Sequence, residues 1–482
     1  MTNKNSFHLS DQTYFRLIIL LATLGVVIFL IFAATQDITK IVFLILIALA
    51  IILPIGTKLI RETFDIFEPL FIANVALGVM FLARPVADLL TGETIHLGYD
   101  ILPTFNEALM LVFVGIAAFE VGYFLGPGSL WSQYLPQPEK FRVDQVRIAG
   151  FFFLFLGGFL FSLFLAKGGG LDLLLFLMKG RQAEDNGIFL ASSGYYYNGL
   201  LMWSASALIF FALFILLKQR FFLFIFVIVF GALAIFYGSR GTRSQLLPLT
   251  IALPTFWYLF HQKRPSGFVL SITFLILISL AGWLREVRNV GVVSYDQKDT
   301  PTLTSALASP FKQLGDIITG YDNEMFDALC NELLVVPESL PYKPLGSIAD
   351  IFIRIIPRSM WPNGEKPLET NDSVIVALWP EHYEHSRASS ALSILGPFYA
   401  DSGFIGVAIG MFFIGVILSM MWHWFLANQR NYTALLLYSM SLPFVIILMR
   451  GTLPDTLSRI LFMVVPIFIL LMIERFRLVK SH

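Results

Sequence analysis

FFLFIFVIVFGALAIFYGSRGTRSQLLPLTIALPTFWYLF, residues 221–260, consists of two apolar stretches on either side of a short polar turn. Each stretch, 221–238 and 245–260, has about the length that a helix needs to cross the hydrocarbon of a bilayer. The turn between them contains GSRGTR and carries two cations, Arg240 and Arg243. Residues 221–260 therefore predict two transmembrane helices joined by a turn that places positive charge at a membrane boundary.

The composition of the whole chain is that of a polytopic membrane protein. Of its 482 residues 57% are hydrophobic and 14% are charged, so a polar surface around a single apolar core is excluded. Lys plus Arg and Asp plus Glu both number 33, and this balance gives no indication of a nucleic-acid partner. The single cysteine, Cys330, excludes an internal disulfide and a cysteine-based metal cluster. No cleavable signal peptide is evident, so the first apolar segment is expected to remain in the protein.

Apolar runs of roughly 17 to 23 residues recur along the chain. They lie at 15–34, 39–56, 67–83, 105–126, 148–166, 198–217, 221–238, 245–260, 267–284, 404–427, 432–449 and 457–474. A helix satisfies its own backbone hydrogen bonds, which makes such a run typical of a transmembrane helix. We therefore predict an all-α polytopic membrane protein with about twelve transmembrane helices.

Basic residues recur in the loops that would be cytoplasmic if the N-terminus is cytoplasmic. These loops contain Lys58 and Arg61; Lys140, Arg142 and Arg147; Lys218 and Arg220; Lys263 and Arg264; Arg430; and, at the end of the chain, Arg475, Arg477 and Lys480. An excess of Lys and Arg is typical of cytoplasmic loops. Both termini are therefore expected on the cytoplasmic side.

This orientation divides the chain into three parts. Residues 1–284 carry transmembrane helices 1–9, residues 285–403 form one large extracytoplasmic loop with short helices, and residues 404–482 carry helices 10–12 and a short cytoplasmic tail. A loop of that length usually has a specialised task. The apolar segment 171–177 is too short to span and predicts an interfacial or re-entrant helix on the outer side.

The outer side of this topology carries an excess of arginine. The residues are Arg84, Arg181, Arg240, Arg243, Arg285, Arg288, Arg354, Arg358, Arg387, Arg450 and Arg459. Arginine keeps its charge in any environment, and its planar fork matches phosphate oxygens in pairs. The pattern indicates an extracytoplasmic phosphate or pyrophosphate site.

GSRGTR has the features of an anion-binding turn. Gly238 and Gly241 would let the backbone turn tightly, and the next helix is expected to begin near Ser244 with its free amides on the same side. Arg240 and Arg243 would then converge with the helix N-terminus on one anion. The alternative is that these arginines reach lipid headgroups or pair with a carboxylate.

Other arginines predicted on the outer side also lie near the ends of predicted helices. Arg285 and Arg288 lie in LREVRN where the ninth helix ends, and Glu286 between them is a local partner that would make their role structural. Arg450, in MRGTLP before the last span, repeats the pattern of the turn in a shorter form.

The large loop, residues 285–403, combines proline-containing turns with aromatic and acidic residues in IIPRSMWPNGEKP, ALWPEHYEHSRASS and LGPFYADSGFIG. Aromatic rings beside carboxylates are a common arrangement for binding sugars, although Trp and Tyr also belong to the interfacial belt of membrane proteins. His382 and His385 could share a helix face as metal ligands, but no further ligand stands at motif spacing, which favours a general base or a surface histidine. Asp401 is another candidate base, with capping of the tenth helix as the alternative.

The topology and the short segments GSRGTR at 238–243, IIPRSMWP at 355–362 and LGPFYADSGFIG at 395–406 resemble one family. The chain resembles the bacterial oligosaccharide repeat-unit polymerases, the Wzy-type polymerases of O-antigen and exopolysaccharide. The resemblance covers nearly the whole length in topology, whereas the local matches are short.

The resemblance implies a metal-independent glycosyltransferase of the GT-C type in the bacterial inner membrane, without a cofactor. Such an enzyme transfers the growing glycan from its undecaprenyl pyrophosphate to the nonreducing end of an incoming lipid-linked repeat unit. Its partners would be these lipid-linked donor and acceptor saccharides, the bilayer and a chain-length regulator, and not nucleic acid.

The same resemblance implies site residues in this chain. By motif, the pyrophosphate-binding residues would be Arg240, Arg243 and Arg358. We add Arg285 and Arg288 from their location, and Arg450 because MRGTLP is similar to the turn at 238–243. Fixed guanidinium groups would stabilise the charge that develops on the leaving pyrophosphate. The acceptor hydroxyl needs a general base, for which His382, His385 and Asp401 are alternatives.

Other functions would use similar features. An O-antigen ligase shares the lipid pyrophosphate donor and the long outer loop but delivers the glycan to lipid A core, and another lipid-linked glycosyltransferase would also be compatible. A lipid-linked oligosaccharide transporter would be expected to carry polar residues deep in several spans, whereas most charges here lie at the ends of the predicted helices.

Overall fold

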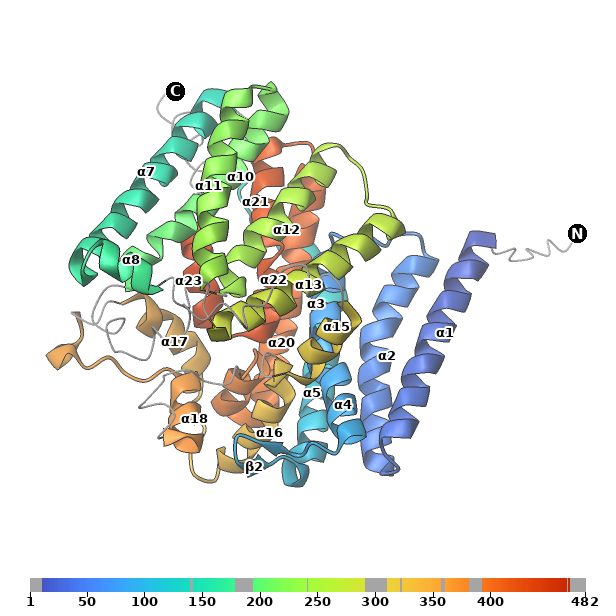
Figure 1. Cartoon of the computed structure of the whole chain (residues 1–482). Coiled ribbons are helices and arrows are strands. Elements are labelled where there is room, and N and C mark those ends of the chain that lie inside the picture. Colours follow the sequence, from blue (N-terminus) through green and yellow to red (C-terminus); the bar gives the residue numbers. More distant parts are fainter. Residues whose placement is uncertain are drawn as a thin grey trace, which may run out of the picture.

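A computed structural model describes residues 11–138, 142–177, 194–240, 242–290, 310–320, 323–356, 360–380, 392–465 and 467–468. Within these ranges the chain is almost wholly helical, and its long helices pack side by side in a bundle (Figure 1). The exception is a short hairpin in which strand β1 (Ile95–His96) pairs with the antiparallel strand β2 (Tyr99–Asp100).

The long helices form the bundle, and in two places consecutive shorter helices continue one another. Their bounds are α1 Asp11–Ala34, α2 Ile38–Ile60, α3 Pro69–Gly78 continuing through η1 Val79–Ala83 into α4 Arg84–Thr91, α5 Leu102–Leu125, α7 Val143–Gly168, α10 Gly199–Leu217, α11 Arg220–Ser239, α12 Arg243–Phe260, α13 Gly267–Val290, α20 Leu395–Asn428, α21 Tyr432–Ser441 followed by α22 Phe444–Arg450, and α23 Leu453–Met463.

Short helices occupy the connections. They are α6 Gly128–Trp131, η2 Ser132–Tyr134, α8 Leu171–Leu177, α9 Gly194–Tyr197, α15 Pro310–Thr319, α16 Met325–Val335, α17 Gly346–Ile355, η7 Pro362–Gly364 and α18 Thr370–Leu378. Five of these short helices lie within residues 285–403, the predicted large loop: α15, α16, α17, η7 and α18.

Within the described ranges, nine helices are long and apolar enough to cross a membrane. These are α2, α3 with its continuation to α4, α5, α7, α10, α11, α13, α20, and α21 with α22. The segments α1, α12 and α23 are helical at the other places where the sequence predicts spans. The prediction of a helical polytopic membrane protein is therefore confirmed.

The helices pack around two apolar clusters. One joins α7, α10, α11, α12 and α21, which lie together at the upper left of Figure 1. The other joins α2, α3, α5 and α20 with α16 of the large loop. Because α16 takes part in the second cluster, this part of the loop is packed into the body of the protein.

Close packing of α5 against α20 depends on glycine. A methyl group at Gly122 would lie 2.0 Å from the carbonyl oxygen of Phe412, and one at Gly415 would lie 2.2 Å from that of Phe119. Small residues let two membrane helices approach until their backbones touch. The two glycines are therefore required by the contact between these helices.

Helix α20 contains a break near the predicted start of the tenth span. Ser402 and Gly403 have non-helical backbone angles, and Gly403 has φ 63° and ψ −143°, a conformation that favours glycine. The predicted start at residue 404 coincides with the long straight part of the helix, but the helical segment already begins at Leu395. The break separates a short buried turn from the spanning part.

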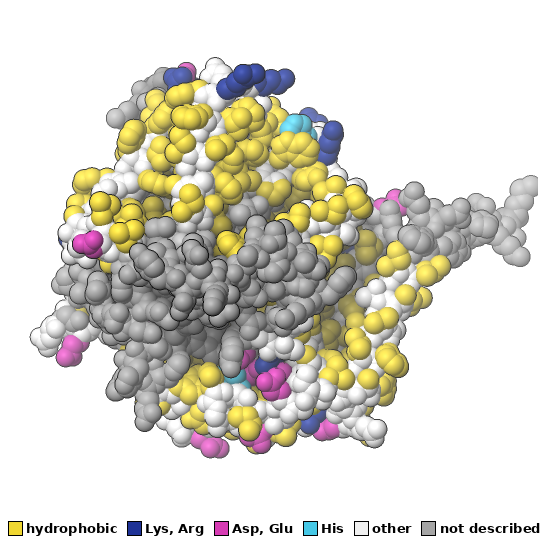
Figure 2. Space-filling view, in the orientation of Figure 1, with side chains coloured by type: hydrophobic (Ala, Val, Ile, Leu, Met, Phe, Trp, Pro, Cys, Tyr) yellow, Lys and Arg dark blue, Asp and Glu magenta, His cyan; other side chains and the backbone are white. Residues whose placement is uncertain are grey.

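The predicted cytoplasmic loops lie together at one end of the bundle. Arg264 forms an ion pair with Asp65 at 2.5 Å, which joins the α12–α13 loop to the α2–α3 loop. A pocket of about 820 Å³ at the same end is lined by Val143, Leu217 and Arg430. It lies between the connection before α7, the connection from α10 to α11 and the connection from α20 to α21. Lys and Arg side chains are visible at this end in Figure 2, at the top.

Candidate functional site

Arg240 lies at the end of α11 and is buried, with 6% of its surface exposed. Its Nη1 donates a hydrogen bond to the hydroxyl of Tyr197, which ends the short helix α9, at 2.6 Å. The guanidinium carbon also lies 5.1 Å from the centre of the Tyr197 ring and 5.8 Å from that of Phe236. The cation is thus held between aromatic rings, an arrangement that fixes its position.

The turn after Arg240 is closed by Thr242. The Thr242 amide donates to the carbonyl oxygen of Tyr237 at 3.0 Å, and its hydroxyl donates to the same oxygen at 3.3 Å. The expectation that Gly238 makes the turn possible is wrong, because Gly238 lies inside α11 without a positive φ. Gly241 lies outside the described residues.

Helix α12 begins at Arg243, one residue before the predicted start near Ser244. The backbone of Arg243 is therefore placed in the first turn of a helix that begins beside Arg240. The structure does not describe the Arg243 side chain. A helix N-terminus carries partial positive charge, which adds to the field of the nearby guanidinium group.

A second guanidinium group reaches this turn from α23. Arg459 Nη1 donates to the Ser244 hydroxyl at 3.0 Å. The same side chain pairs with Asp455 one helical turn earlier, with contacts of 3.1 and 3.3 Å. The Tyr197 hydroxyl in turn donates to the side-chain oxygen of Gln245 at 3.2 Å.

We call these residues the Arg240 cluster: Tyr197, Arg240, Ser244, Gln245, Asp455 and Arg459. They come from four helices, and the cluster holds two arginines, one carboxylate and two hydroxyl groups. Guanidinium and hydroxyl donors at fixed positions are suited to a phosphate or pyrophosphate anion.

Sequence reasoning identified part of this cluster. It counted Arg459 among the outward arginines without assigning it to the turn, and the spacing of four residues to Asp455 is a typical helical ion pair. It missed Tyr197, because a tyrosine in the run YYY carries no signal of a partner 43 residues away.

The other arginines predicted to bind pyrophosphate lie outside the Arg240 cluster or have side chains that the structure does not describe. Arg450 is the last residue of α22, just before the helix that carries Arg459. Arg285 and Arg288 lie on α13, which extends to Val290 and not only to residue 284, but the structure does not describe their side chains. Arg358 lies outside the described residues.

Among the candidate bases only Asp401 falls within the described ranges; His382 and His385 do not. One Asp401 oxygen accepts a hydrogen bond from the Ser347 amide at 2.9 Å, and the other accepts one from the Ser347 hydroxyl. Ser347 lies in the first turn of α17, so Asp401 caps α17. The alternative prediction, that Asp401 caps the tenth predicted helix, is therefore wrong.

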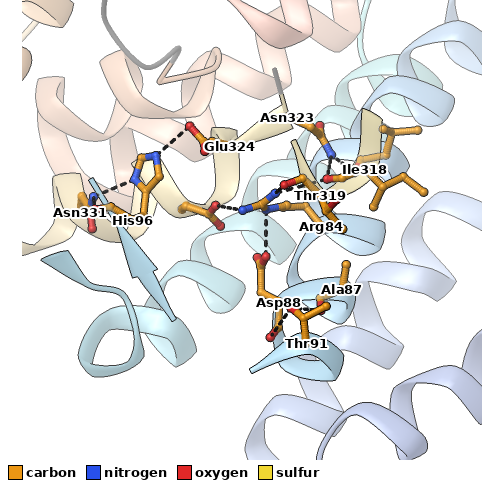
Figure 3. Close-up of polar contacts among 12 residues, drawn as sticks. Arg84, Ala87, Asp88, Thr91, His96, Ile318, Thr319, Asn323, Glu324 and Asn331 are labelled. Carbon is orange, nitrogen blue, oxygen red and sulfur yellow. Dashed lines mark hydrogen bonds and ion pairs between the residues drawn. The ribbon is translucent and has the colours of Figure 1, made fainter. Parts of the chain in front are cut away.

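Arg84, the first residue of α4, makes a separate polar cluster (Figure 3). Its Nε forms an ion pair with Asp88 at 2.9 Å, and its Nη2 donates to Asp327 of α16 at 2.6 Å. Its Nη1 donates to the carbonyl oxygens of Ile318 and Thr319 at the end of α15. Hydrogen bonds from Nη1 and Nη2, together with the ion pair at Nε, hold the guanidinium group within the protein, and we conclude that Arg84 anchors the large loop on α4.

His96 joins the hairpin to the same loop (Figure 3). Its Nε2 lies 3.0 Å from a carboxylate oxygen of Glu324, and its Nδ1 lies 2.9 Å from the side-chain nitrogen of Asn331. Asn331 also donates to the His96 carbonyl oxygen at 3.1 Å. An amide that donates to Nδ1 leaves the proton on Nε2, which then donates to Glu324.

Glu332 is fully buried on α16 and lies against Gly396 at the start of α20. Neither carboxylate oxygen makes a hydrogen bond to a described residue. Burial raises the pKa of this carboxyl to about 8, because the interior disfavours the charged form. Glu332 is therefore largely protonated at neutral pH.

No group of three or more His, Cys, Asp or Glu within the described part of the chain could hold a metal ion.

Comparisons with protein-family models, with curated proteins and with solved structures find no match to this chain.

Proposed function

We propose that the protein polymerises undecaprenyl-pyrophosphate-linked oligosaccharide repeat units into O-antigen or a related polysaccharide. In this proposal it is a glycosyltransferase of the GT-C type that needs no metal ion or cofactor. It transfers the growing glycan to an incoming lipid-linked repeat unit on the extracytoplasmic side of the bacterial inner membrane.

The observation that carries the proposal is the Arg240 cluster. Arg240 and Arg459 come from different helices, and Ser244, which accepts a hydrogen bond from Arg459, lies in the first turn of α12, the helix that follows Arg240. Glycosyl transfer from a polyprenyl pyrophosphate releases a highly charged leaving group at a membrane boundary. Donors that are already fixed in position stabilise that charge without reorganisation during the reaction.

The helical architecture supports a lipid-embedded site. We propose about twelve transmembrane helices in a GT-C-like arrangement with both termini in the cytoplasm. The gathering of basic loops at the end opposite the large loop favours this orientation. A chain-length regulator would be a further partner.

For the general base we favour His382 or His385 over Asp401. Both oxygens of Asp401 already accept hydrogen bonds from Ser347, and only 7% of its surface is exposed. A base must reach the acceptor hydroxyl directly or through one water molecule.

The reaction is tested with purified protein and lipid-linked repeat units alone. A polymerase makes a ladder of lipid-linked products. A ligase makes no product until lipid A core is added, and a transporter makes no product with either acceptor. A ladder that appears only with lipid A core, or no ladder at all from folded protein, would contradict the proposal.

The site is tested with Arg240→Ala and Arg459→Ala in the same assay. Each change is expected to slow chain growth on the order of a hundredfold, because a fixed donor to the leaving group is lost. Arg264→Ala is the matched control, since Arg264 is exposed at the basic end and pairs with Asp65. Normal growth in both cluster variants would remove this site assignment, even if the ladder itself is formed.

A further inference from the structure

Helix α17 (Gly346–Ile355), in the large loop, has its polarity inverted relative to a helix that faces water. Its exposed face consists of apolar residues: Ile348 is 48% exposed, Phe352 64% and Ile355 48%, and the preceding Leu345 is 66% exposed. These positions recur at intervals of three and four residues, so they form one stripe. A surface helix in water would show polar residues there.

The opposite face of α17 is buried and carries two polar side chains beside Gly346 and Ile353. Ser347 and Asp350 are 1% and 2% exposed. Ser347 donates its amide and its hydroxyl to Asp401, and Asp350 accepts a hydrogen bond from the amide of Thr370, the first residue of α18, at 2.7 Å. These contacts lock the rotation of the helix, so the apolar stripe stays outward.

The surroundings of α17 are those of a membrane boundary. It packs against α23, on which Leu457 and Leu461 are exposed. In Figure 1 it lies just below the lower ends of α7 and α8. Cationic groups flank the stripe. Lys343 is exposed before the helix, and Arg354, in its last turn, pairs through Nε with Glu369 at 3.1 Å while its side chain is 41% exposed.

We propose that α17 is an interfacial helix whose apolar stripe lies among the acyl chains of the bilayer leaflet on the side of the large loop. An amphipathic helix in this position buries its apolar residues below the headgroups, and nearby Lys and Arg reach the phosphates. The occupant is the bilayer because the stripe continues the apolar surface of the bundle and has cations at both ends. The inference is independent of the proposed reaction.

A contiguous exposed patch of large apolar side chains is uncommon on a water-facing surface and marks a binding or membrane surface.

The hydrogen bonds between Asp401 and Ser347 also affect where the large loop lies. Asp401 joins α17 to the kinked start of α20, so insertion of α17 holds this part of the loop at a defined depth beside the helix that carries Arg459.

The test is the depth of single spin labels in liposomes of phosphatidylethanolamine and phosphatidylglycerol that contain no polyprenyl lipid. Labels are placed with Ile348→Cys and Phe352→Cys. Glu338→Cys, at an exposed position before α17, is the control for water, and Phe155→Cys, at a 72% exposed position on α7, is the control for lipid. The native Cys330 is fully buried, and burial raises the pKa of its thiol, so it does not take the label.

At positions 348 and 352 we expect oxygen to collide with the label several-fold more often, relative to a water-soluble nickel chelate, than at position 338. The ratio should approach that at position 155. Labels at 348 and 352 that are as accessible to nickel as the label at 338 would overturn the inference. Labels inaccessible to both reagents would also overturn it, because they would show that protein, and not lipid, covers the stripe.

Discussion

At the scale of single residues, Glu332 of α16 is a buried acid that affects stability. Its carboxyl is buried without a hydrogen bond to any described residue, and burial alone raises its pKa to about 8 from the ordinary value of 4.5. Between pH 4.5 and about 8, the folded protein therefore keeps a proton on Glu332 that the unfolded chain releases.

This difference makes stability depend on pH. Because the pKa is raised on folding, the contribution of Glu332 is fully present below pH 4.5 and is lost as pH rises through about 8. We expect Glu332→Gln to match the wild type at pH 4 and to be more stable by roughly 4 to 5 kcal/mol at pH 9. The measurement is thermal unfolding in detergent across this range, with exposed Glu338→Gln as the control.

Part of the dependence of stability on pH should remain in the Glu332→Gln protein. Burial, Asp372 and Asp350 raise the pKa of Glu369 to about 7, against the opposing effect of Arg354, so Glu369 titrates in the same range. A variant whose stability falls with pH as steeply as that of the wild type would show that Glu332 is not the group responsible.

Arg84 is one of the residues that attach the large loop to the helix bundle. Removing one partner of a buried ion pair leaves the other charge unpaired in a poorly solvated place. We expect Arg84→Met to destabilise the protein by about 3 to 5 kcal/mol, because it strands Asp88 and Asp327. Thermal unfolding of the purified variant measures the loss.

A double variant separates the ion pair from simple packing. Asp327→Leu combined with Arg84→Met should be less destabilised than the sum of the two single changes, because neither then leaves the other's charge alone. Fully additive losses would contradict the assigned contact.

At the scale of helices, the contact between α5 and α20 depends on the absence of side chains. A methyl group at Gly122 would overlap the carbonyl oxygen of Phe412, so Gly122→Ala forces the two helices apart. We expect a markedly lower melting temperature and less folded protein in the membrane, measured by fluorescence-detected size exclusion.

Gly231→Ala is the matched control for this change. A methyl group at Gly231, on α11, meets no atom within 4 Å, and alanine has the higher helix propensity. It should leave the melting temperature unchanged or raise it slightly. Equal behaviour of the two variants would show that the close approach of α5 and α20 is not a constraint on folding.

At the scale of the whole molecule, the distribution of charge predicts sidedness. Lys218 and Gln262 lie in connections at the basic end, whereas Glu93 precedes the hairpin at the other end. We expect a membrane-impermeant maleimide applied to intact cells to label Glu93→Cys and not Lys218→Cys or Gln262→Cys. All three should react after the cells are opened, and the reverse pattern in intact cells would invert the proposed topology.

The positions of the spans were predictable from sequence because each spanning helix is selected by lipid for its own length and hydropathy. This is why the predicted runs coincide with helices even where prolines interrupt them, as at Pro54 in α2 and Pro254 in α12. The boundaries were less accurate where the chain leaves lipid, as in α13 and at the start of α20.

The polar contacts were not predictable in the same way. Arg84 meets Asp327, 243 residues away, and Arg459 meets Ser244, 215 residues away. Asp401 has the composition and location of a base or a local cap, yet it caps a helix that begins more than fifty residues earlier. No periodicity along the chain encodes such pairs.

By itself, the sequence determined that this is a helical membrane protein, where most of its helices lie, and which turn carries the paired arginines. Those properties depend on local composition and on the solvent around each segment. The tertiary structure alone decided that Tyr197 and Arg459 join Arg240, that Arg84 anchors the loop, and that α17 turns its apolar face outward. These properties depend on which segments pack together, because a buried charge or polar group must be satisfied by whatever the fold brings beside it.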